Sequence, residues 1–341
     1  MSNKILVVGG AGYIGSHMVL TLRQNGYIPI VLDNLSTGHR DAVLDAELIV
    51  GDMNDTALLM SIMKQHEFKA IMHFASYIEV GESVRLPFKY YQNNVCATLN
   101  LLEVMLKNNV KHFIFSSTAA VYGEPKSSLI TESHPLAPVN PYGRSKWMVE
   151  EMLKDFAKSD GLRYAVLRYF NAAGADQSAR LAERHEPESH IIPTIFQVLL
   201  GQRHDMMVFG HDYPTADGTC IRDFIHVTDL CQAHLLALQV LLNKGDHIIC
   251  NLGTGRGYSV LEVIQSVSKV LGKRIPFKFG PRRLGDVAIL VADATRAQQL
   301  LQWAPQYSDL DTIVDHAFRA YISHHQRLTN TTSCAISTIA S

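Results

Sequence analysis

The sequence predicts an α/β fold built on a doubly wound parallel sheet, followed by a smaller mixed α/β region. Short, nearly continuous apolar runs alternate with longer amphipathic stretches through the first half of the chain. This alternation is typical of parallel strands that helices cover on both faces. A glycine-rich turn follows the first run, as in Rossmann-like folds. The six expected strands are 4–10, 28–34, 47–52, 69–75, 111–117 and 163–171.

The turn after the first expected strand reads "VVGGAGYIGSH" and has Gly9, Gly12 and Gly15 at GxxGxxG spacing. Gly9 would permit a tight turn, Gly12 would let the backbone approach a pyrophosphate, and Gly15 would let the next helix pack closely. The amides and dipole at the N-terminus of that helix favour an anion. The sequence therefore predicts a dinucleotide site here.

An acidic residue, Asp33, ends the second expected strand. At this place a carboxylate can bind the hydroxyls of the adenosine ribose, and it would repel a 2′-phosphate. NAD is therefore favoured over NADP. The alternative is an ordinary capping or turn role for Asp33.

The regular alternation of strands and helices breaks after residue 171, where the chain becomes polar and irregular. We expect a nucleotide-binding domain over 1–171 and a substrate-binding domain over 172–328. The run "HIICNLG" at 247–253 again resembles a buried strand and is expected to return to the first sheet. The tail at 329–341 is rich in Ser and Thr without helical periodicity, and we expect it to be flexible.

Composition argues against several classes of function. The 31 Lys and Arg residues balance 32 Asp and Glu residues, which leaves no basic excess for nucleic acid or an anionic membrane. Five cysteines lack CxxC spacing and sixteen histidines include no HExxH motif, so we expect neither a metal site nor a disulfide framework. No signal peptide is evident and no apolar stretch approaches the roughly 18 residues of a membrane span. We therefore expect a cytoplasmic protein.

The stretch "NPYGRSK" at 140–146 predicts the start of a helix that bears a chemical group. Asn140 is a favoured N-cap and Pro141 suits the first helical position. Tyr142 and Lys146 would then share one helix face. A neighbouring cation favours a phenolate, so we expect Lys146 to lower the pKa of Tyr142 and make it a usable general base. The alternative is a surface tyrosine beside a solvated lysine.

Together these motifs resemble the extended short-chain dehydrogenase/reductase family, and within it the UDP-glucose 4-epimerases. The resemblance covers about residues 3–325. It rests on nine stretches in this order: "GGAGYIGSH", "DNLSTGHR", "HFASYIEVGESV", "YYQNNV", "FSSTAAVYGEP", "NPYGRSK", "RYFNAAGAD", "DGTCIRDFIHVTDL" and "NLGTGRGYSV".

The resemblance implies that Tyr142 is the catalytic base, that Lys146 holds the nicotinamide ribose, and that Thr118 hydrogen-bonds the reacting sugar hydroxyl. The base would remove the proton of the C4 hydroxyl while C4 passes a hydride to NAD+. The resulting 4-keto sugar would turn and take the hydride back on its other face. For Thr118, the alternative is a hydroxyl satisfied by backbone at a strand end.

The resemblance also implies the residues that contact each ligand. The expected NAD contacts are Gly9, Gly12, Tyr13, Ile14, Gly15, Asp33, Asn34, Ser36, Asp52, Met53, Phe74, Ala75, Asn93, Tyr142, Lys146 and Tyr169. The expected UDP-sugar contacts are Thr118, Tyr142, Asn171, His190, Ile191, Phe209, Arg222, Arg283, Asp286 and Leu290.

Some of these positions also have plain structural interpretations. Arg222 could form an ion pair with the adjacent Asp223, Phe209 could be a core residue, and His190 could pack within its loop. Leu290 matches a position beside the sugar where some relatives have a bulky Tyr. The smaller Leu predicts that UDP-N-acetylhexosamines are also accepted, and a wholly structural role is the alternative.

Other enzymes on the same scaffold are the main rival functions. Nucleotide-sugar 4,6-dehydratases and decarboxylases need a further acid or base after the Ser or Thr, where this chain has Ala119 and Ala120. A UDP-hexuronate or UDP-pentose 4-epimerase would share the mechanism, and a non-catalytic NAD-sensing protein would be expected to lose Tyr142 or Lys146. By resemblance we also expect a homodimer, through helices around 90–108 and 146–158.

Overall fold

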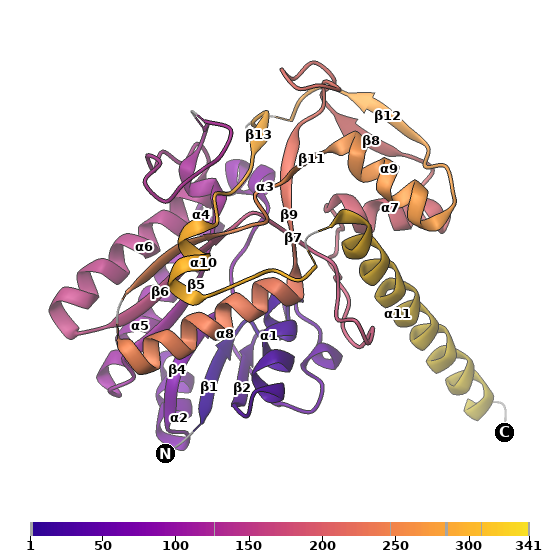
Figure 1. Ribbon diagram of the computed structural model, residues 1–341. Coiled ribbons are helices and arrows are strands. Elements are labelled where there is room, and N and C mark those ends of the chain that lie inside the picture. Colours follow the sequence, from indigo (N-terminus) through magenta and orange to yellow (C-terminus); the bar gives the residue numbers. More distant parts are fainter. Residues whose placement is uncertain (1–2, 126, 246, 284–285, 308, 340–341) are drawn as a thin grey trace.

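A seven-stranded parallel sheet forms the centre of the computed structural model, which describes residues 3–125, 127–245, 247–283, 286–307 and 309–339 (Figure 1). The strand order is β10-β6-β5-β4-β1-β2-β3. The bounds are β1 Lys4–Val8, β2 Ile28–Asp33, β3 Glu47–Val50, β4 Phe68–His73, β5 His112–Thr118, β6 Arg163–Tyr169 and β10 Ile248–Leu252. The doubly wound fold class is confirmed, and all six expected strands and the returning strand at 247–253 are present.

Helices cover both faces of this sheet, and the alternation of side chains along each strand decides which helix each side chain contacts. Ile5 and Val7 of β1 pack with α1 (Tyr13–Gln24) and α8 (Val227–Lys244). Leu6 and Val8 point to the opposite face, toward α2, α5 and α6. The bounds on that face are α2 Thr56–Gln65, α5 Thr98–Lys107 and α6 Pro141–Asp160. Short turns connect these elements: η1 Arg40–Val43, α3 Val80–Arg85, α4 Pro87–Tyr90, the π-helical η2 Tyr91–Ala97, and η3 Ala119–Tyr122.

A second region lies beyond the carboxyl edge of the main sheet (Figure 1). Its central strand is β9, which pairs with β7, β11 and β13, while β8 pairs with β12. Helices α7 and α9 pack with α11 around a separate apolar core that includes Ile195, Val263 and Ile313. The bounds are β7 Asn171–Ala173, α7 Ile191–Leu199, β8 Met206–Phe209, β9 Ile221–His226, β11 Gly257–Ser259, α9 Val260–Leu271, β12 Phe277–Gly280, β13 Ile289–Leu290, α10 Thr295–Leu301 and α11 Leu310–Ile339.

The chain returns to the first sheet more than once after residue 171. Helix α8 packs on the α1 side of the sheet, β10 extends the sheet beside β6, and α10 adds Ala297 and Leu301 to the same core. The division into 1–171 and 172–328 stays a prediction about domains. The structure shows that segments of the second stretch complete the first sheet.

Helix α11 runs to Ile339 and projects from the rest of the chain (Figure 1). The lack of helical periodicity over 329–341 did not indicate this helix, which the structure describes to Ile339; residues 340–341 lie outside the described residues. A helix nucleated by packing can propagate into a segment of poor intrinsic propensity, which local periodicity does not reveal. The flexibility of this end stays a prediction.

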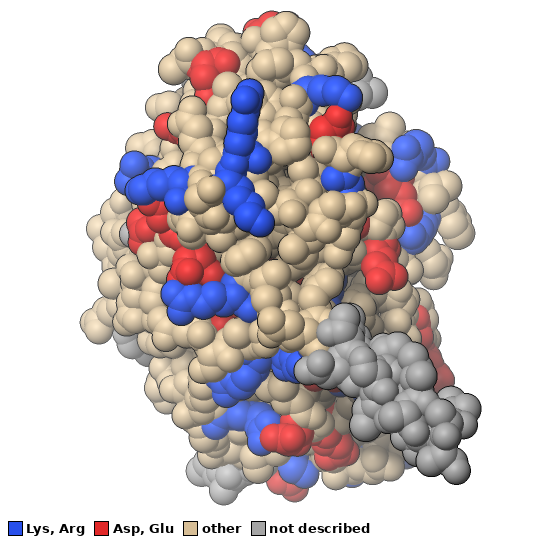
Figure 2. Space-filling model, turned by 90° about the vertical axis from the view of Figure 1, so that its right-hand side faces the viewer, with Lys and Arg blue, Asp and Glu red and all other residues tan. Residues whose placement is uncertain are grey.

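The surface shows no large area of one charge on the face drawn in Figure 2, where Lys and Arg lie among Asp and Glu. This mixture agrees with the formal net charge of −1. Among the described helices, none combines the length and the apolar character that crossing a bilayer requires.

Candidate active site

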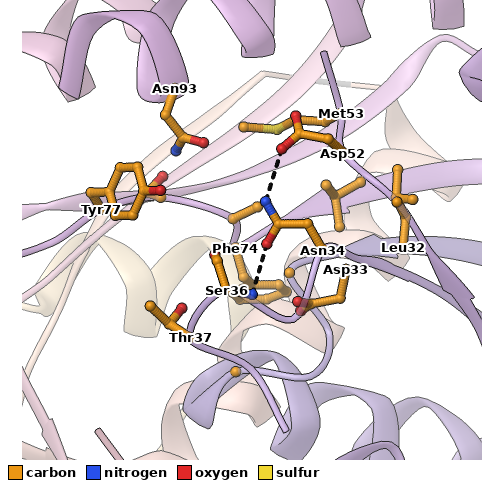
Figure 3. Close-up of a pocket in the computed structure, with 16 residues that line it drawn as sticks. Leu32, Asp33, Asn34, Ser36, Thr37, Asp52, Met53, Phe74, Tyr77 and Asn93 are labelled. Carbon is orange, nitrogen blue, oxygen red and sulfur yellow. Dashed lines mark hydrogen bonds between the residues drawn. The ribbon is translucent and has the colours of Figure 1, made fainter. Parts of the chain in front are cut away.

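An open cavity lies at the carboxyl ends of β1, β2 and β4 (Figure 3). The chain crosses from β3 to β4 on the other side of β1, and ligands of doubly wound sheets bind at such a switch in strand order. Ten of the expected NAD contacts line the cavity: Gly9, Gly12, Asp33, Asn34, Ser36, Asp52, Met53, Phe74, Ala75 and Asn93. Sequence reasoning missed Val8, Leu32, Thr37, Gly51, Ser76 and Tyr77, which follow or precede those residues in the same strands and turns.

The three glycines of the first turn meet different demands. Gly9 has φ +80°, and a Cβ there would lie 2.5 Å from the Ala75 nitrogen. At Gly15 a Cβ would lie 2.1 Å from the Gly9 oxygen, so α1 can approach the turn only without a side chain. At Gly12 the nearest atom to a Cβ is the Gly9 oxygen at 3.5 Å, an ordinary contact. Gly12 lines the cavity, and a Cβ there would not clash with the protein. The absence of a side chain at Gly12 therefore leaves space for a ligand, as the backbone approach of a dinucleotide requires.

Asp33 is held at the cavity wall by backbone amides. Its Oδ2 accepts a hydrogen bond from the Ala11 nitrogen at 2.9 Å, and its Oδ1 accepts one from the Leu35 nitrogen at 2.8 Å. Burial raises the pKa of the Asp33 carboxyl, and these two amides oppose the rise. Each oxygen keeps a lone pair for another donor, as hydroxyl binding requires. Asn34 next to it donates to Asp52 at 2.8 Å (Figure 3).

The opposite wall of the cavity comes from the π-helical segment Tyr91–Ala97. Asn93 lines the cavity, and its side chain donates to Oδ1 of Asn94 at 3.0 Å. Asn94 is 1% exposed and bonds both the amide and the carbonyl of Tyr77 and the hydroxyl of Ser145. Asn94 thereby ties the cavity wall to α6. Sequence reasoning missed it, although the adjacent Asn pair was a visible signal, and single π-turns are frequent at functional sites.

Helix α6 begins as the sequence predicts, since the Asn140 side chain accepts from the Gly143 nitrogen at 2.8 Å and Pro141 is the first helical residue. Tyr142 and Lys146 both face the end of β5. Lys146 Nζ donates to the Ser116 carbonyl at 2.8 Å, and the Thr118 hydroxyl lies near enough to the Tyr142 phenol to act on its pKa. The four residues from Tyr142 to Lys146 rise about 6 Å along the helix and two strand residues span about 6.6 Å, so α6 running beside β5 can make both contacts at once.

The expected lowering of the Tyr142 pKa by Lys146 is wrong for this structure. Burial raises the pKa of Tyr142 to about 12, and the nearby Thr118 hydroxyl only partly opposes the rise. Lys146 Nζ is directed to the Ser76 hydroxyl at 2.7 Å and to Ser116, and it lies 4.9 Å from the centre of the Phe115 ring. The spacing along the helix places Tyr142 and Lys146 on one face. The position of the Lys146 ammonium is nevertheless decided by its hydrogen bonds to Ser76 and Ser116.

The remaining expected NAD contacts are not among the residues that line the cavity. Ile14 and Tyr169 pack against the core between α1 and α8, and the Tyr13 hydroxyl donates to the Gly174 carbonyl at 2.7 Å. Tyr169 hydrogen-bonds the Ser116 hydroxyl. Burial and then the nearby Tyr142 raise the pKa of Tyr169.

Lys146 itself is 2% exposed, and burial lowers the pKa of its ammonium to about 7, although Glu150 opposes the shift. The folded protein therefore binds this proton more weakly than the unfolded chain, whose lysines titrate near about 10.4. Burying this ammonium lowers the free energy of unfolding by its full amount below about pH 7. This loss becomes smaller as the pH rises toward about 10.4, by up to about 1.4 kcal/mol per pH unit.

We expect Lys146→Met to stabilise the protein freed of NAD, with the largest advantage at and below about pH 7 and a smaller one at about pH 9. Urea unfolding of both proteins at the two pH values measures this. Lys154→Met is the matched control, because Lys154 lies on the same helix, is 35% exposed and pairs with Glu151. An equal advantage at both pH values would contradict the assignment to Lys146.

The expected UDP-sugar contacts form two groups in the second region. Arg222 Nη2 lies 3.7 Å from Asp286 Oδ1, and the Arg283 guanidinium stacks 4.1 Å from the Phe209 ring centre. The alternative pairing of Arg222 with Asp223 is not formed. Asp223 is fully buried and accepts hydrogen bonds from Thr254, Gly255 and Ala292 instead.

The other expected UDP-sugar contacts lie between these groups and the main sheet. Asn171 begins β7, directly after β6, and Ile191 begins α7. Leu290 pairs with Arg222 across β13 and β9 and packs against the cluster of Val121, Tyr122 and Ile130, of which the first two are close in sequence to Thr118. His190 turns its Nδ1 to two buried carboxylates, so its imidazole takes part in a separate cluster.

Known proteins of the same kind match the chain over most of its length. Residues 5–253 match the "NAD dependent epimerase/dehydratase family". A UDP-glucose 4-epimerase of Halalkalibacterium halodurans is 50% identical over 320 residues, which is 94% of this chain and 96% of that protein. The solved UDP-glucose 4-epimerase of Brucella ovis in complex with NAD is 47% identical, has a TM-score of 0.90, and covers 93% of this chain and 97% of its own.

A further solved relative is the UDP-Glc/GlcNAc 4-epimerase of Campylobacter jejuni, with 43% identity, a TM-score of 0.81, and coverage of 94% of this chain and 99% of its own. The match to the family model spans the strands of the first sheet. It agrees with the cavity, the glycine-rich turn and the placement of Tyr142 and Lys146 on α6. This chain belongs to the NAD dependent epimerase/dehydratase family.

Proposed function

We propose that this protein interconverts UDP-glucose and UDP-galactose by epimerisation at C4, through a transient 4-keto sugar and with bound NAD+. The observation that carries the proposal is the convergence of Tyr142, Lys146 and Thr118 at the end of β5, beside a cavity that fits a dinucleotide. The names of the relatives at 43–50% identity support the same reaction.

Each residue of this set has a distinct task in the proposed reaction. Tyr142 takes the proton of the C4 hydroxyl and returns it, while the Thr118 hydroxyl orients the phenol and the sugar oxygen. Lys146 binds the ribose of the cofactor. NAD+ supplies the hydride acceptor when bound. Because burial holds the Tyr142 pKa at about 12 in the structure, proton transfer depends on added stabilisation of the phenolate in the complete complex.

The residues after Thr118 favour epimerisation over elimination. Ala119 and Ala120 begin the η3 turn, and neither has a group that exchanges protons. A 4,6-dehydratase or a decarboxylase needs such a group beside the reacting ring. The two alanines therefore favour epimerisation, in which the 4-keto sugar takes the hydride back at C4 without a further proton transfer.

For the nucleotide, we propose that Arg222, Arg283 and Asn171 bind the diphosphate, and that Asp286 accepts from the uridine ribose. Arginine suits this task because its planar guanidinium forms paired hydrogen bonds to phosphate oxygens. Phe209 would lie near the uracil, with Ile191 and the backbone of His190. The 3.7 Å separation of Arg222 from Asp286 leaves the guanidinium able to move to a phosphate.

The direct test is an assay of the purified protein with UDP-galactose, in which the two C4 epimers are separated chromatographically. We expect UDP-glucose to form without added NAD, up to an equilibrium mixture. A folded, NAD-containing protein that converts neither UDP-galactose nor its N-acetyl analogue would overturn the hexose proposal. UDP-glucuronate and UDP-xylose would then be tested as the alternatives.

We further propose that the protein accepts UDP-N-acetylhexosamines, because Leu290 leaves more room than a Tyr would. Leu290→Tyr should lower kcat/KM for UDP-N-acetylgalactosamine by roughly 10-fold or more, through steric exclusion, and change that for UDP-galactose far less. Leu290→Met keeps the volume and is the matched control. Equal losses for both sugars in Leu290→Tyr would mean that Leu290 acts only in packing.

We also propose a homodimer, formed through α4, α5 and α6. Three large apolar side chains are exposed there: Phe88 at 79%, Leu99 at 43% and Met148 at 39%. A second copy of the chain would cover them, since exposed apolar side chains on these three helices favour association. A light-scattering mass equal to one chain would contradict this proposal.

A further inference from the structure

The segment between β7 and α7, residues 174–190, has no regular secondary structure, yet two of its acidic side chains are buried. Loops of this length inside a compact protein usually need a specific reason for their order. The last part of the segment reads "ERHEPESH" and contains two Glu-x-His pairs, Glu183 with His185 and Glu188 with His190. All four ligand-type atoms lie within 4.8 Å of one another.

Four separations in this cluster are close to the edge length of a tetrahedral coordination shell, and all the ligand-type atoms lie within 4.8 Å of one another. His190 Nδ1 lies 3.2 Å from Glu183 Oε1 and 3.2 Å from Glu188 Oε1. His185 Nδ1 lies 3.6 Å from Glu183 Oε1 and 3.6 Å from Glu188 Oε2. A tetrahedral ion with bonds of about 2.0–2.1 Å to N and O ligands has ligand edges of about 3.3–3.4 Å. The four measured edges lie on both sides of that value.

His185 provides an independent observation. Its Nδ1 is inaccessible to solvent and has no hydrogen-bond partner within the described residues. At 3.6 Å from both carboxylates the nitrogen is too far for a hydrogen bond. A buried, unbonded imidazole nitrogen directed at two carboxylates is what a ligand set presents before its ion is added.

Charge also favours a cation at the centre of the cluster. The Glu183 and Glu188 side chains are 7% and 4% exposed, and two carboxylates so close together in a buried place repel one another. The nearest arginines bind elsewhere: Arg184 pairs with Asp41, and Arg203 donates to the Glu188 carbonyl. Two carboxylates, two neutral imidazoles and one divalent ion give zero net charge.

Further contacts orient the ligands and connect the cluster to the site. Glu188 Oε1 accepts hydrogen bonds from the Ser189 and His190 nitrogens, each at 2.9 Å. The His185 ring lies edge-on to Tyr13 of the glycine turn at 6.3 Å. Ser189 donates to Glu79 at 2.7 Å, next to the cavity wall. Such outer contacts are typical of ordered metal sites.

We propose that Glu183, His185, Glu188 and His190 bind one divalent transition-metal ion, with Zn²⁺ as the best fit to two imidazoles and two carboxylates. The four protein ligands fill a tetrahedral shell, so the ion has a structural role. It fixes segment 174–190 between the glycine turn and α7. The proposed epimerisation uses none of these four side chains, since only the His190 backbone is placed near the uracil, and the test does not depend on activity.

The test is metal binding by the untagged full-length protein after dialysis against a chelator. We expect one equivalent of Zn²⁺ in calorimetric titration, a rise in melting temperature on binding, and the intense visible absorption of tetrahedral Co²⁺ when Co²⁺ is used instead. A wild-type protein that binds no stoichiometric metal overturns the proposal and leaves the cluster as ion pairs only. Octahedral Co²⁺ absorption overturns the four-ligand site.

Two variants locate the site. Glu183→Gln and His185→Ala should each weaken Zn²⁺ binding by more than about 100-fold, beyond what loss of an outer contact costs. His66→Ala is the matched control, since His66 also lies beside a glutamate, Glu47, at 3.5 Å, but has no second pair. Unchanged stoichiometry and affinity in both cluster variants overturns the assignment. If a variant does not fold, the Co²⁺ spectrum of the wild type still decides the coordination.

Discussion

Tyr142→Phe should lower epimerisation of UDP-galactose by about 10²–10⁴-fold or more while leaving the fold and the NAD content unchanged. Removing the phenol oxygen deletes the proposed proton acceptor, and general acid–base groups contribute rate factors of this size. The ring is 91% buried by the same neighbours in either residue, since Tyr142 is 9% exposed. The substitution removes the interaction of the phenol with the Thr118 hydroxyl.

The measurement is kcat for epimer formation, together with NAD absorbance of the purified protein and its melting temperature. Tyr164→Phe is the matched control. Tyr164 is 5% exposed, lies at the end of β6 that is remote from Thr118, and stacks on His247 at 4.4 Å. We expect near-normal activity in that control. A Tyr142→Phe protein that retains NAD and more than about one tenth of the wild-type rate would show that another group accepts the proton.

The first sheet could be predicted from the sequence because its signals are local and agree with one another. Apolar runs, a glycine turn after the first run, and Asp33 at the end of the second fix strand identity and the position of a ligand. The N-cap of α6 was predictable for the same reason, since Asn140 and Pro141 act within one turn. The cavity residues that were missed are neighbours of predicted ones and differ in having no distinctive side-chain chemistry.

Features that depend on contacts between distant segments could not be predicted in this way. The position of Lys146 Nζ is decided by Ser76 on another loop, which sequence spacing within α6 cannot show. The packing of α8 and α10 on the first sheet likewise depends on surfaces that are far apart in sequence. The expectation of no metal rested on the lack of a standard motif, whereas the two Glu-x-His pairs become a candidate site only through burial.

A second set of buried charges lies beneath the proposed catalytic residues and links α6 to the sheet. Arg168 of β6 is 2% exposed and Glu150 of α6 is fully buried. Their side chains form two hydrogen bonds, Nε to Oε1 at 3.0 Å and Nη2 to Oε2 at 2.5 Å. Ser117 of β5 also donates to Glu150, and Arg168 donates to the Tyr122 hydroxyl. An arginine that follows the apolar run Tyr164–Leu167 within a buried strand was the signal for this pair in the sequence.

Arg168→Met should lower the free energy of unfolding by about 3–5 kcal/mol, because Glu150 would keep its buried charge without a partner. The double variant Arg168→Met, Glu150→Met should recover much of this loss, since an apolar pair of similar volume avoids the desolvation cost. Urea unfolding of the wild type, both single variants and the double variant measures the coupling. Arg23→Met is the control, because its exposed pair with Asp45 at 3.4 Å should contribute less than about 1 kcal/mol. A loss in Arg168→Met no larger than in the control would mean that Glu150 becomes neutral or reaches water when its partner is removed.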